Sequence, residues 1–392
     1  MRKSGINLVA IKEYNQALIT QLICANQPTT RNFLTKKSML TSMTLTNITA
    51  ELIRRDIISE YDYPIKGAVG RNPKVLVVSD SSPVVAGIWM SKDFLFGSIC
   101  DFSLKLITAK RVDFDVQETD ATVLDKLVEM GQYLLSFSHR RIMGIGISCV
   151  GVVDSQNGVI RNVTGFFGIK TLDIKSRMEK EFEIPVYVKN DMQSSALCEM
   201  YFGIGKRTDN FIYVGITNGI GSAVVSNRQL MNNLGSGGEL GHTTINYQGP
   251  LCDCGSRGCL EMYASVPNFL KRINLECGSH FVTLRQALAF CQTNPPAHAI
   301  FDDVCNHLVY ALNNLVNIIN IDTIVLGHSG VAFPDYALES MKKRISEISV
   351  SRNSLKFNII KTEFEENSPL FGSVCIVLDQ IFTGRLPMWT DI

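Results

Sequence analysis

The 392-residue sequence predicts an α/β protein in two lobes, with a small helical unit in front of them. Short helical patterns fill the beginning of the chain. From Ser79 onward, apolar strand-like runs alternate with helical patterns, and the alternation starts again at Phe211. Hydrophobic residues make up 45% of the chain and charged residues 19%, which excludes disordered and fibrous proteins and allows sizeable cores.

The helical unit begins with the segment 11–26, whose apolar residues recur at helical spacing. Pro28 ends this helix, and the pair Thr29 and Thr30 supplies a cap for a second helix over 31–37. After a turn at residues 38–40, Thr41 caps a third helix over 42–55. The buried stripe of the third helix is expected to consist of Leu45, Ile48 and Leu52.

Two strand-like segments, 57–61 and 74–78, predict a hairpin directly after the third helix. Three short helices, a tight turn and a basic charge predict a helix-turn-helix, with the hairpin as its wing. The third helix opens with short or polar side chains that suit base edges and phosphates. These candidate DNA contacts are Ser42, Met43, Thr44, Thr46 and Asn47.

Charge is distributed unevenly along the chain. Residues 1–75 hold 11 Lys and Arg against five Asp and Glu, whereas the remainder holds 27 against 32. This asymmetry favours an anionic partner, double-stranded DNA, at the N-terminal end, although an ordinary solvated basic face has the same composition. Arg71, flanked by Gly67, Gly70 and Pro73, has the context of a side chain that enters a minor groove, and equally that of a solvated loop.

The two lobes are predicted from strand and helix patterns. The expected strands are 84–90, 95–101, 142–148, 186–189, 211–216, 222–225 and 323–326. The expected helices are 122–137, 175–181 and 301–318. Such an alternation is typical of α/β folds.

Several features predict a cytoplasmic protein. The chain starts with Met1-Arg2-Lys3-Ser4 and no apolar leader follows. The 11 cysteines are odd in number and stand mostly alone in apolar surroundings, as Cys149 does, which favours buried thiols in a reducing compartment. The apolar stretch 307–326 contains four asparagines, so we expect no membrane span.

A metal-ligand pattern lies in the second lobe. His242, Cys252, Cys254 and Cys259 fall within eighteen residues, and one imidazole with three thiolates is a ligand set of closed tetrahedral zinc. We therefore predict a structural Zn²⁺; a reactive or disulfide-forming cysteine cluster is the alternative. Glu239 and Glu261 flank the ligands, so the metal would hold two carboxylates at a fixed separation, as a polyol site requires.

With these motifs in place, the sequence resembles the ROK family of repressors, open reading frames and sugar kinases, and specifically its repressor branch. The similar segments are GGELGH at 237–242, CDCGSRGCLE at 252–261, GIGISCVGVVDSQNGVI at 144–160 and IPVYVKND at 184–191. Residues 30–58 are similar to the helix-turn-helix of that branch, which adds Arg31 to the candidate DNA contacts. GRNP at 70–73 matches its Gly-Arg element and favours the DNA role of Arg71.

The resemblance implies a two-lobed, actin-like or ribonuclease-H-like sugar kinase fold preceded by a winged helix-turn-helix. The implied domains are 1–78 for DNA binding, 79–190 with 368–392 for the small lobe, and 191–367 for the large lobe with the zinc motif. Implied sugar contacts are Asn190, Asp191, Glu239, His242 and Glu261. Asp191 matches the general base of the kinases, and its position equally suits a helix N-cap.

The chain departs from the kinases of the family at the phosphate-binding turn, Asp-x-Gly-Gly-Thr. The matching segment is GIWMSKDFL at 87–95, with Trp89 in place of the Asp and Ser91-Lys92-Asp93 in place of Gly-Gly-Thr. The Gly-Gly segment on the nucleotide side reads Gly327-His328-Ser329-Gly330, while residues 217–221 partly keep a second phosphate segment. In the N-terminal unit, Asp56 replaces a Gly between the recognition helix and the wing.

These observations predict a sugar-responsive transcriptional repressor without catalytic residues, which acts as a homodimer or a dimer of dimers. The expected partners are a DNA operator and a small sugar effector, and Asp191 is a vestigial general base. Two alternatives remain open: an active sugar kinase with a DNA-binding appendage, and a repressor controlled by a protein partner. Phe166 and Phe167 either stack on the sugar or pack in the core.

Overall fold

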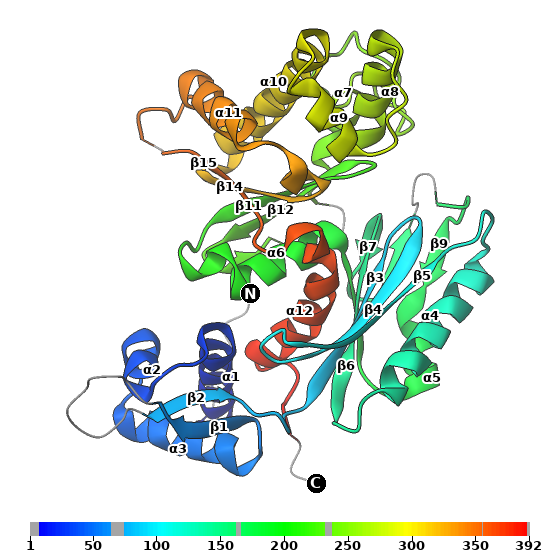
Figure 1. Ribbon diagram of the computed structural model, residues 1–392. Coiled ribbons are helices and arrows are strands. Elements are labelled where there is room, and N and C mark those ends of the chain that lie inside the picture. The colour runs from blue at the N-terminus through cyan, green and yellow to red at the C-terminus, as the bar shows by residue number, and fades with distance from the viewer. Residues whose placement is uncertain (1–7, 64–73, 162–165, 232–236, 355, 390–392) are drawn as a thin grey trace.

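A computed structural model describes residues 8–63, 74–161, 166–231, 237–354 and 356–389. The N-terminal unit consists of three helices and a two-stranded antiparallel sheet, visible at the lower left of Figure 1. Its elements are α1 (Leu8–Asn26), α2 (Arg31–Ser38), α3 (Ser42–Arg54), β1 (Ile58–Asp62) and β2 (Lys74–Val78). Thr30 and Thr41 cap α2 and α3 as predicted, since their hydroxyls accept hydrogen bonds from Phe33 N and Thr44 N.

The core of this unit is formed by one face of each helix and the inner face of the hairpin. Its fully buried residues include Ile19, Ile23, Leu34, Leu45 and Leu52. Leu45, Ile48 and Leu52 of α3 are therefore the buried stripe that the sequence predicted. Asp56 adopts the left-handed conformation, with φ at 56°, so the turn that glycine would favour is kept with an Asp in it.

The first of the two large sheets has five strands in the order β10-β6-β3-β4-β5. Its strands are β3 (Val84–Met90), β4 (Phe94–Asp101), β5 (Leu106–Asp113), β6 (Ile142–Cys149) and β10 (Val186–Asn190). Strands β3, β6 and β10 are parallel, while β4 and β5 continue the sheet as antiparallel neighbours. Helices α4 (Asp120–Ser136) and α5 (Ile174–Phe182) cover one face, and a small sheet of β7 (Val152–Asp154), β8 (Val159–Arg161) and β9 (Thr171–Asp173) follows β6.

The second large sheet has the order β13-β12-β11-β14-β15. Its strands are β11 (Phe211–Ile216), β12 (Ile220–Ser226), β13 (Gln229–Leu230), β14 (Thr323–His328) and β15 (Asn358–Lys361). On one side it carries a helical group that lies at the top of Figure 1. This group comprises α7 (Glu261–Ala264), α8 (Val266–Cys277), α9 (Leu284–Cys291), α10 (Pro295–Ile319) and α11 (Asp335–Ile348).

Two helices lie between the sheets and connect them. Helix α6 (Asp191–Phe202) packs on β11 and β12, and α12 (Ser368–Phe382) packs along α6 and across β3 and β6. The approach is close because a Cβ on Gly146 would collide with the backbone oxygen of Ser373, and one on Gly372 would lie 2.6 Å from the backbone of Ser194. The chain then runs from α12 to the N-terminal unit, so α12 reaches from the sheets to that unit (Figure 1).

Each predicted strand and helix corresponds to an element of the structure, with small differences at the ends. The predicted helix 301–318 begins earlier, at Pro295, because Asn294 accepts a hydrogen bond from Ala297 N and caps it. The elements that the sequence did not predict are β5, β7, β8, β9, β13 and β15 among the strands, and α6, α7, α8, α9, α11 and α12 among the helices. Across the described ranges, no helix combines the length and apolarity that a membrane crossing requires.

Candidate metal centre and ligand site

The four predicted metal ligands converge. The ligand atoms of His242, Cys252, Cys254 and Cys259 all lie within 4.8 Å of one another. Cys252 Sγ lies 3.7 Å from His242 Nδ1, and Cys254 Sγ lies 3.6 Å from Cys259 Sγ. The chemistry and closeness of these donors fit a tetrahedral Zn²⁺, and a closed set of four leaves no position for a reacting water.

Local backbone geometry aims the three sulfurs. Gly255 and Gly258 have φ of 92° and 64°, a region that strains other residues. The turn is fixed because Gly255 N donates to Cys252 O, and Cys252 N donates to Ser256 O. Thr244 and Cys259 form an isolated bridge, which returns the chain to the short helix η2 (Leu240–His242) that carries the imidazole.

The thiols of the cluster differ in acidity. The backbone N–H of Ser256 lowers the pKa of Cys254 to about 7, so this exposed thiol readily yields a thiolate. Burial raises the pKa of Cys252 to about 12 and also raises that of Cys259. Metal binding requires deprotonated thiols, so a bound cation would offset this cost of burial.

The two predicted carboxylates lie beside the cluster. Glu261 Oε1 is 3.4 Å from His242 Nδ1, and Cys252 Sγ donates to the same oxygen over 3.1 Å. Withdrawal from bulk water raises the pKa of Glu239, and the neighbouring carboxylates Asp191 and Glu261 raise it further, although much of this side chain still contacts solvent. The acidic groups therefore share one region, as acceptors for several hydroxyls would.

Asn190 and Asp191 stand where β10 ends and α6 begins. Asn190 is the N-cap: its Oδ1 accepts from Met192 N over 2.9 Å, and its Nδ2 donates to Gly151 O over 3.0 Å. The alternative in which Asp191 serves as the cap is corrected by this geometry, because Asp191 is the first helical residue. It is 6% exposed, and its Oδ1 accepts from Met192 N.

The phosphate-binding positions of the kinases carry different groups. The ring of Trp89 on β3 lies edge-on to Phe94 at 4.9 Å and to His328 at 6.4 Å between centroids. Residues 217–219 form a turn between β11 and β12, in which Thr217 N donates to Gly219 O. An indole and an imidazole thus lie near each other at two segments that resemble nucleotide-binding segments of the kinases, and sequence reasoning did not foresee that they meet.

For Phe166 and Phe167, the sequence left open whether they stack on the sugar or pack in the core. Phe166 is 1% exposed and lies edge-on to Phe114, with the ring centroids 5.8 Å apart. Phe167 is partly buried against the same apolar core. Core packing therefore accounts for the position of Phe166 and for the buried part of Phe167.

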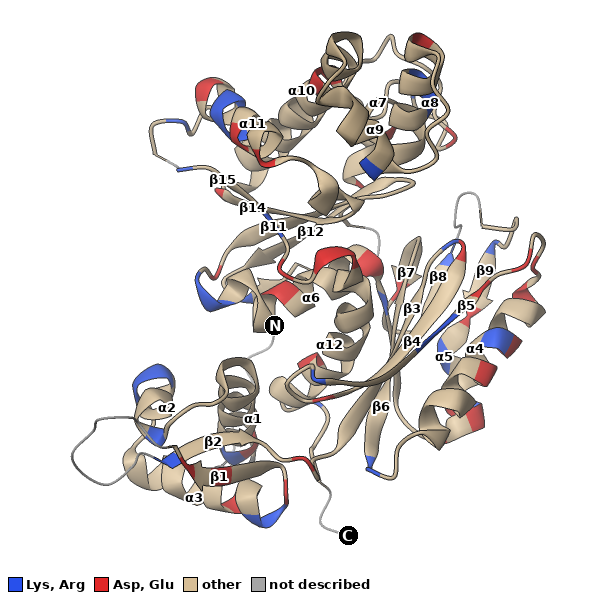
Figure 2. Cartoon of the chain, viewed as in Figure 1, with Lys and Arg blue, Asp and Glu red and all other residues tan. Residues whose placement is uncertain are grey.

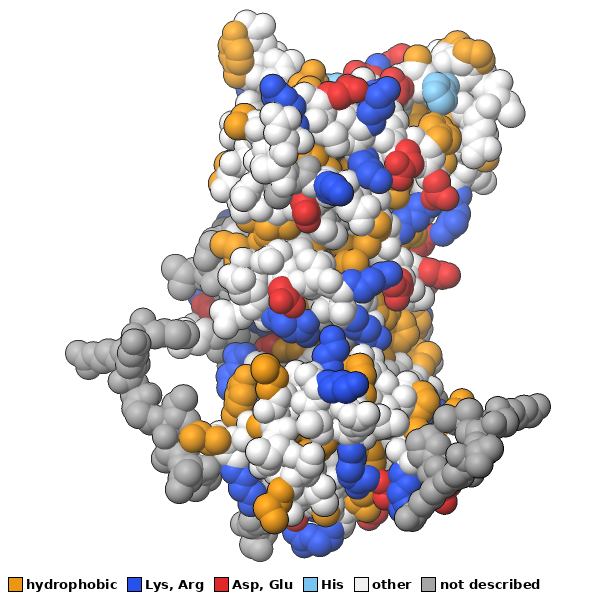
Figure 3. Space-filling view, turned by 90° about the vertical axis from the view of Figure 1, so that its left-hand side faces the viewer, with side chains coloured by type: hydrophobic (Ala, Val, Ile, Leu, Met, Phe, Trp, Pro, Cys, Tyr) orange, Lys and Arg blue, Asp and Glu red, His pale blue; other side chains and the backbone are white. Residues whose placement is uncertain are grey.

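The candidate DNA contacts on α3 are largely accessible. Ser42, Thr46 and Asn47 are exposed, Met43 is 79% exposed, and Thr44 is half-buried with its hydroxyl 2.9 Å from that of Thr41. The Lys and Arg positions of α2 and of the end of α3 are blue in Figure 2, and Figure 3 shows basic and apolar side chains together over the lower part of the molecule, where this unit lies.

Arg31 lies apart from that exposed row. Its Nε donates to Thr49 Oγ1 over 3.1 Å and its guanidinium pairs with Glu60 of β1, which also receives Lys74 Nζ at 3.1 Å. Arg31 therefore links α2 to α3 and to the hairpin. Arg71 lies outside the described residues.

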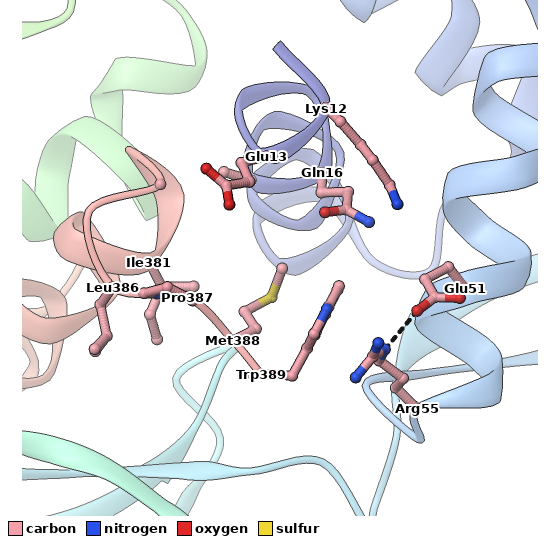
Figure 4. Close-up of a pocket in the computed structure, with 12 residues that line it drawn as sticks. Lys12, Glu13, Gln16, Glu51, Arg55, Ile381, Leu386, Pro387, Met388 and Trp389 are labelled. Atoms are coloured by element: carbon pink, nitrogen blue, oxygen red, sulfur yellow. Dashed lines mark hydrogen bonds and ion pairs between the residues drawn. The ribbon is translucent and has the colours of Figure 1, made fainter. Parts of the chain in front are cut away.

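A pocket of about 370 Å³ lies between the N-terminal unit and the end of the described chain (Figure 4). Lys12, Glu13 and Gln16 of α1 line one side of it, Glu51 and Arg55 another, and residues 384 and 386–389 the third. The guanidinium of Arg55 lies 4.5 Å from the ring centroid of Trp389. Sequence reasoning missed this junction, because its partners come from opposite ends of the chain.

Comparison with known proteins shows similarity over nearly the whole chain. A model of the ROK family matches residues 92–380. The xylose repressor of Bacillus subtilis (strain 168) is 27% identical over 380 residues, which cover 94% of this chain and 96% of that protein. The DNA-binding transcriptional repressor Mlc of Escherichia coli (strain K12) is 23% identical over 390 residues, or 96% and 95% of the two chains.

Solved structures show the same fold. A ROK family transcriptional regulator, described as a homologue of E. coli Mlc, superposes with a TM-score of 0.81 at 23% identity and covers 96% of this chain and 98% of its own. A ROK family glucokinase from Streptomyces griseus, in complex with glucose and AMPPNP, has a TM-score of 0.63 at 18% identity, covering 74% and 98%. The regulator therefore matches nearly the whole chain, whereas the kinase matches about three quarters of it.

Proposed function

This chain belongs to the ROK family, and we propose that it is a DNA-binding transcriptional repressor whose affinity for its operator responds to a sugar. One observation carries the proposal: an exposed, polar helix face in the N-terminal unit is joined to a sugar-kinase-like fold with Trp89 at its phosphate-binding turn. The printed functions of the B. subtilis and E. coli relatives, which match over nearly their full lengths, support it.

The N-terminal unit is proposed to be a winged helix-turn-helix, with β1 and β2 as the wing. Helix α3 would enter the major groove with Ser42, Met43, Thr44, Thr46 and Asn47 toward the bases. Arg71 would add a minor-groove contact. Because Arg31 is held by Glu60 and Thr49, it would act on DNA by positioning α2 against α3, or by a phosphate contact from its remaining exposed edge.

The sugar is proposed to bind among Asn190, Asp191, Glu239, His242 and Glu261. Their carboxylates supply acceptors for hydroxyl groups, and the metal cluster fixes the imidazole beside Glu261. A Zn²⁺ held by His242, Cys252, Cys254 and Cys259 would be structural, since it would stabilise the loop that carries these residues. The matched domains would be 1–78, 79–190 with 368–392, and 191–367.

Sugar binding changes operator affinity if the two arrangements of the lobes bind sugar unequally. In a homodimer or a dimer of dimers, lobe closure would alter the spacing of the two recognition helices, and half-sites demand a fixed spacing. Helix α12 is the element positioned for this role, since it packs along α6 and also contacts α1 of the N-terminal unit, and the residues that follow it line the pocket against that unit.

The test is a sugar titration of the operator complex. DNA selected by the protein from a random library serves as the operator, and D-xylose, D-glucose and N-acetyl-D-glucosamine serve as candidate effectors. One of these sugars is expected to change the operator Kd, while the unrelated polyol glycerol does not. An operator Kd and salt dependence that no sugar alters would refute the proposal.

The chain is further proposed to lack kinase activity, because an indole cannot ligate the magnesium of a nucleotide. A coupled assay of ADP release, with ATP and the same three sugars, should give no sugar-dependent turnover. The S. griseus glucokinase serves as the positive control. Turnover above about 1 s⁻¹, the lower end of ordinary enzyme rates, would establish the alternative of an active kinase.

A further inference from the structure

His328 ends β14 at the side of the sheet where Asp191 begins α6. The side chain is 3% exposed, and its Nε2 lies 3.7 Å from Asp191 Oδ2. Its Nδ1 lies 3.1 Å from the hydroxyl of Tyr213. Within the part of the chain that the structure describes, Nε2 is buried and has no hydrogen-bond partner. A buried polar atom without a partner is costly, so its direction toward Asp191 calls for a ligand.

The backbone at His328 adds a second, independent observation. Its φ of 55° and ψ of −136° lie in a region that glycine occupies readily and that other residues rarely adopt. The chain therefore sustains strain in order to place an imidazole here. Residues held in such conformations cluster at ligand sites, where the surrounding structure maintains them.

The surroundings of the ring are shaped to admit it. A Cβ on Gly215 would lie 2.7 Å from His328 Nδ1, and a Cβ on Gly327 would collide with the hydroxyl of Tyr213. Both neighbours must be glycine for the imidazole and the phenol to lie side by side on adjacent strands. The ring of Trp89, from the other large sheet, lies edge-on to the imidazole, with the two ring centroids 6.4 Å apart.

The proton of the imidazole can be assigned from its partners. The hydroxyl of Tyr213, 3.1 Å away, is able to donate to Nδ1. An imidazole that accepts at Nδ1 carries its proton at Nε2. The opposite tautomer would direct a lone pair of Nε2 at the carboxylate of Asp191, which is unfavourable.

We propose that His328 binds the sugar effector directly, with Nε2 donating to a sugar hydroxyl that in turn donates to Asp191 Oδ2. The two atoms are 3.7 Å apart, a separation that one hydroxyl oxygen about 2.8 Å from each can bridge. Because Nε2 is buried in this arrangement, the hydroxyl would enter as the two lobes shift. Such a hydroxyl satisfies the unpartnered donor and the carboxylate together. This inference rests on the proposed sugar-binding function, and it adds a sugar ligand on β14, in a segment that the resemblance assigned to the nucleotide side.

The contact also has a consequence for selectivity. A site that hydrogen-bonds one hydroxyl through two buried groups rejects the analogue that lacks it, because both groups are then left without a partner. His328 would therefore select sugars by the presence and orientation of a single hydroxyl group. Trp89, edge-on to the imidazole, limits what can extend beyond that hydroxyl.

The experiment combines variants of His328 with sugars that lack single hydroxyl groups. D-Xylose, D-glucose and N-acetyl-D-glucosamine are titrated calorimetrically into the zinc-loaded full chain, followed by the monodeoxy analogues of whichever sugar binds. His328→Leu removes the donor, His328→Gln keeps an N–H donor on a side chain of similar reach, and His328→Gly relieves the backbone conformation. His280→Leu, an exposed histidine of the same chain, is the control.

His328→Leu is expected to weaken binding of the parent sugar about tenfold, the effect of one hydrogen bond between buried groups. His328→Gln should recover most of the affinity, and His280→Leu should leave it unchanged. For one deoxy analogue alone, the wild-type chain and His328→Leu should bind equally. His328→Gly should weaken sugar binding while its melting temperature without sugar stays the same or rises, a combination that a purely structural role would not give.

Two results would contradict the inference in different ways. If His328→Leu binds the parent sugar as the wild-type chain does, or loses the same factor with every analogue, His328 makes no contact with a particular hydroxyl. The proposed sugar response then stands, because the wild-type titrations are independent of the variants. If the wild-type chain binds none of the three sugars, the proposed function itself fails, and this inference with it.

Discussion

The guanidinium of Arg55, directly after α3, lies 4.5 Å from the ring centroid of Trp389, near the C-terminus. Arg55 is also paired with Glu51 of α3, so the end of the proposed recognition helix is attached to the segment that follows α12. The same α12 packs on α6, whose first residue is Asp191. A continuous set of contacts thus joins the proposed sugar site to the proposed winged helix-turn-helix.

Trp389→Ala should weaken the communication between the two sites. A cation–π contact contributes about 0.5–2 kcal/mol, so the ratio of operator Kd values with and without sugar should move toward one by about two- to tenfold. Sugar affinity itself should change little, because Trp389 lies beyond the end of α12, in the pocket lined by α1 and the end of α3 and not beside Asp191. Fluorescence anisotropy of labelled operator gives the ratio, and Leu275→Ala, at an exposed apolar residue of α8, is the control. An unchanged ratio would show that the contact carries no coupling.

Glu51 should make this junction sensitive to acid. Hydrogen bonds from Arg54, and then Arg55, lower the pKa of Glu51 from 4.5 to about 2. Because folding lowers the pKa of Glu51, the ionised carboxylate stabilises the folded chain fully above pH 4.5. This contribution to the free energy of unfolding is lost as the pH falls toward 2. Glu51→Gln should therefore destabilise the chain at pH 7 by no more than about 1 kcal/mol, since the pairs lie at the surface. The difference in melting temperature from wild type should shrink on acidification; a constant difference between pH 7 and 3 would contradict this origin.

Asn47 of α3 and Lys37, an exposed residue in the last turn of α2, should affect DNA binding in different ways. Asn47→Ala should weaken the free energy of binding to the selected operator by about 1–3 kcal/mol and relax specificity at one base pair. Lys37→Ala should weaken binding to all sequences and reduce the salt dependence by about one counterion. Titrations against the operator and a scrambled duplex at several salt concentrations separate the two effects. Equal losses on both duplexes for Asn47→Ala would remove it from the set of base contacts.

Loss of the metal should disrupt the sugar site before the fold. Zinc analysis should find one ion per chain, and chelation or Cys254→Ser should lower both the melting temperature and the affinity for sugar, because Glu261 contacts His242 and Cys252. Cys254 is exposed, so its replacement by Ser leaves no core cavity. Cys277→Ser, outside the cluster, should change neither property. Full sugar affinity in the zinc-free chain would contradict the role given to the metal.

The sequence predicted elements wherever local chemistry determines them. Thr30 and Thr41 identified the starts of α2 and α3, and the spacing of His242, Cys252, Cys254 and Cys259 identified the cluster that the structure brings together. Strand β5 was missed because both of its faces are largely exposed and it lacks the alternating pattern of a half-buried strand.

Contacts between distant segments could not be predicted from the sequence. The meeting of Asp191 with His328 depends on the placement of α6 beside the end of β14, and that of Arg55 with Trp389 on the course of the chain after α12. Helix α12 also escaped prediction, since it is buried nearly all round and has no polar face to give a helical period. Such features follow from the tertiary fold, which local patterns do not specify.

The most direct test of sugar-dependent repression is the operator Kd of the zinc-loaded full chain, measured by fluorescence anisotropy with and without saturating sugar at constant salt. The proposed linkage predicts that one of D-xylose, D-glucose or N-acetyl-D-glucosamine shifts this Kd by about 5- to 150-fold, and that the operator shifts the sugar Kd by the same factor. Tight operator binding that none of these sugars alters would contradict it, and would leave a DNA-binding protein governed by something other than sugar.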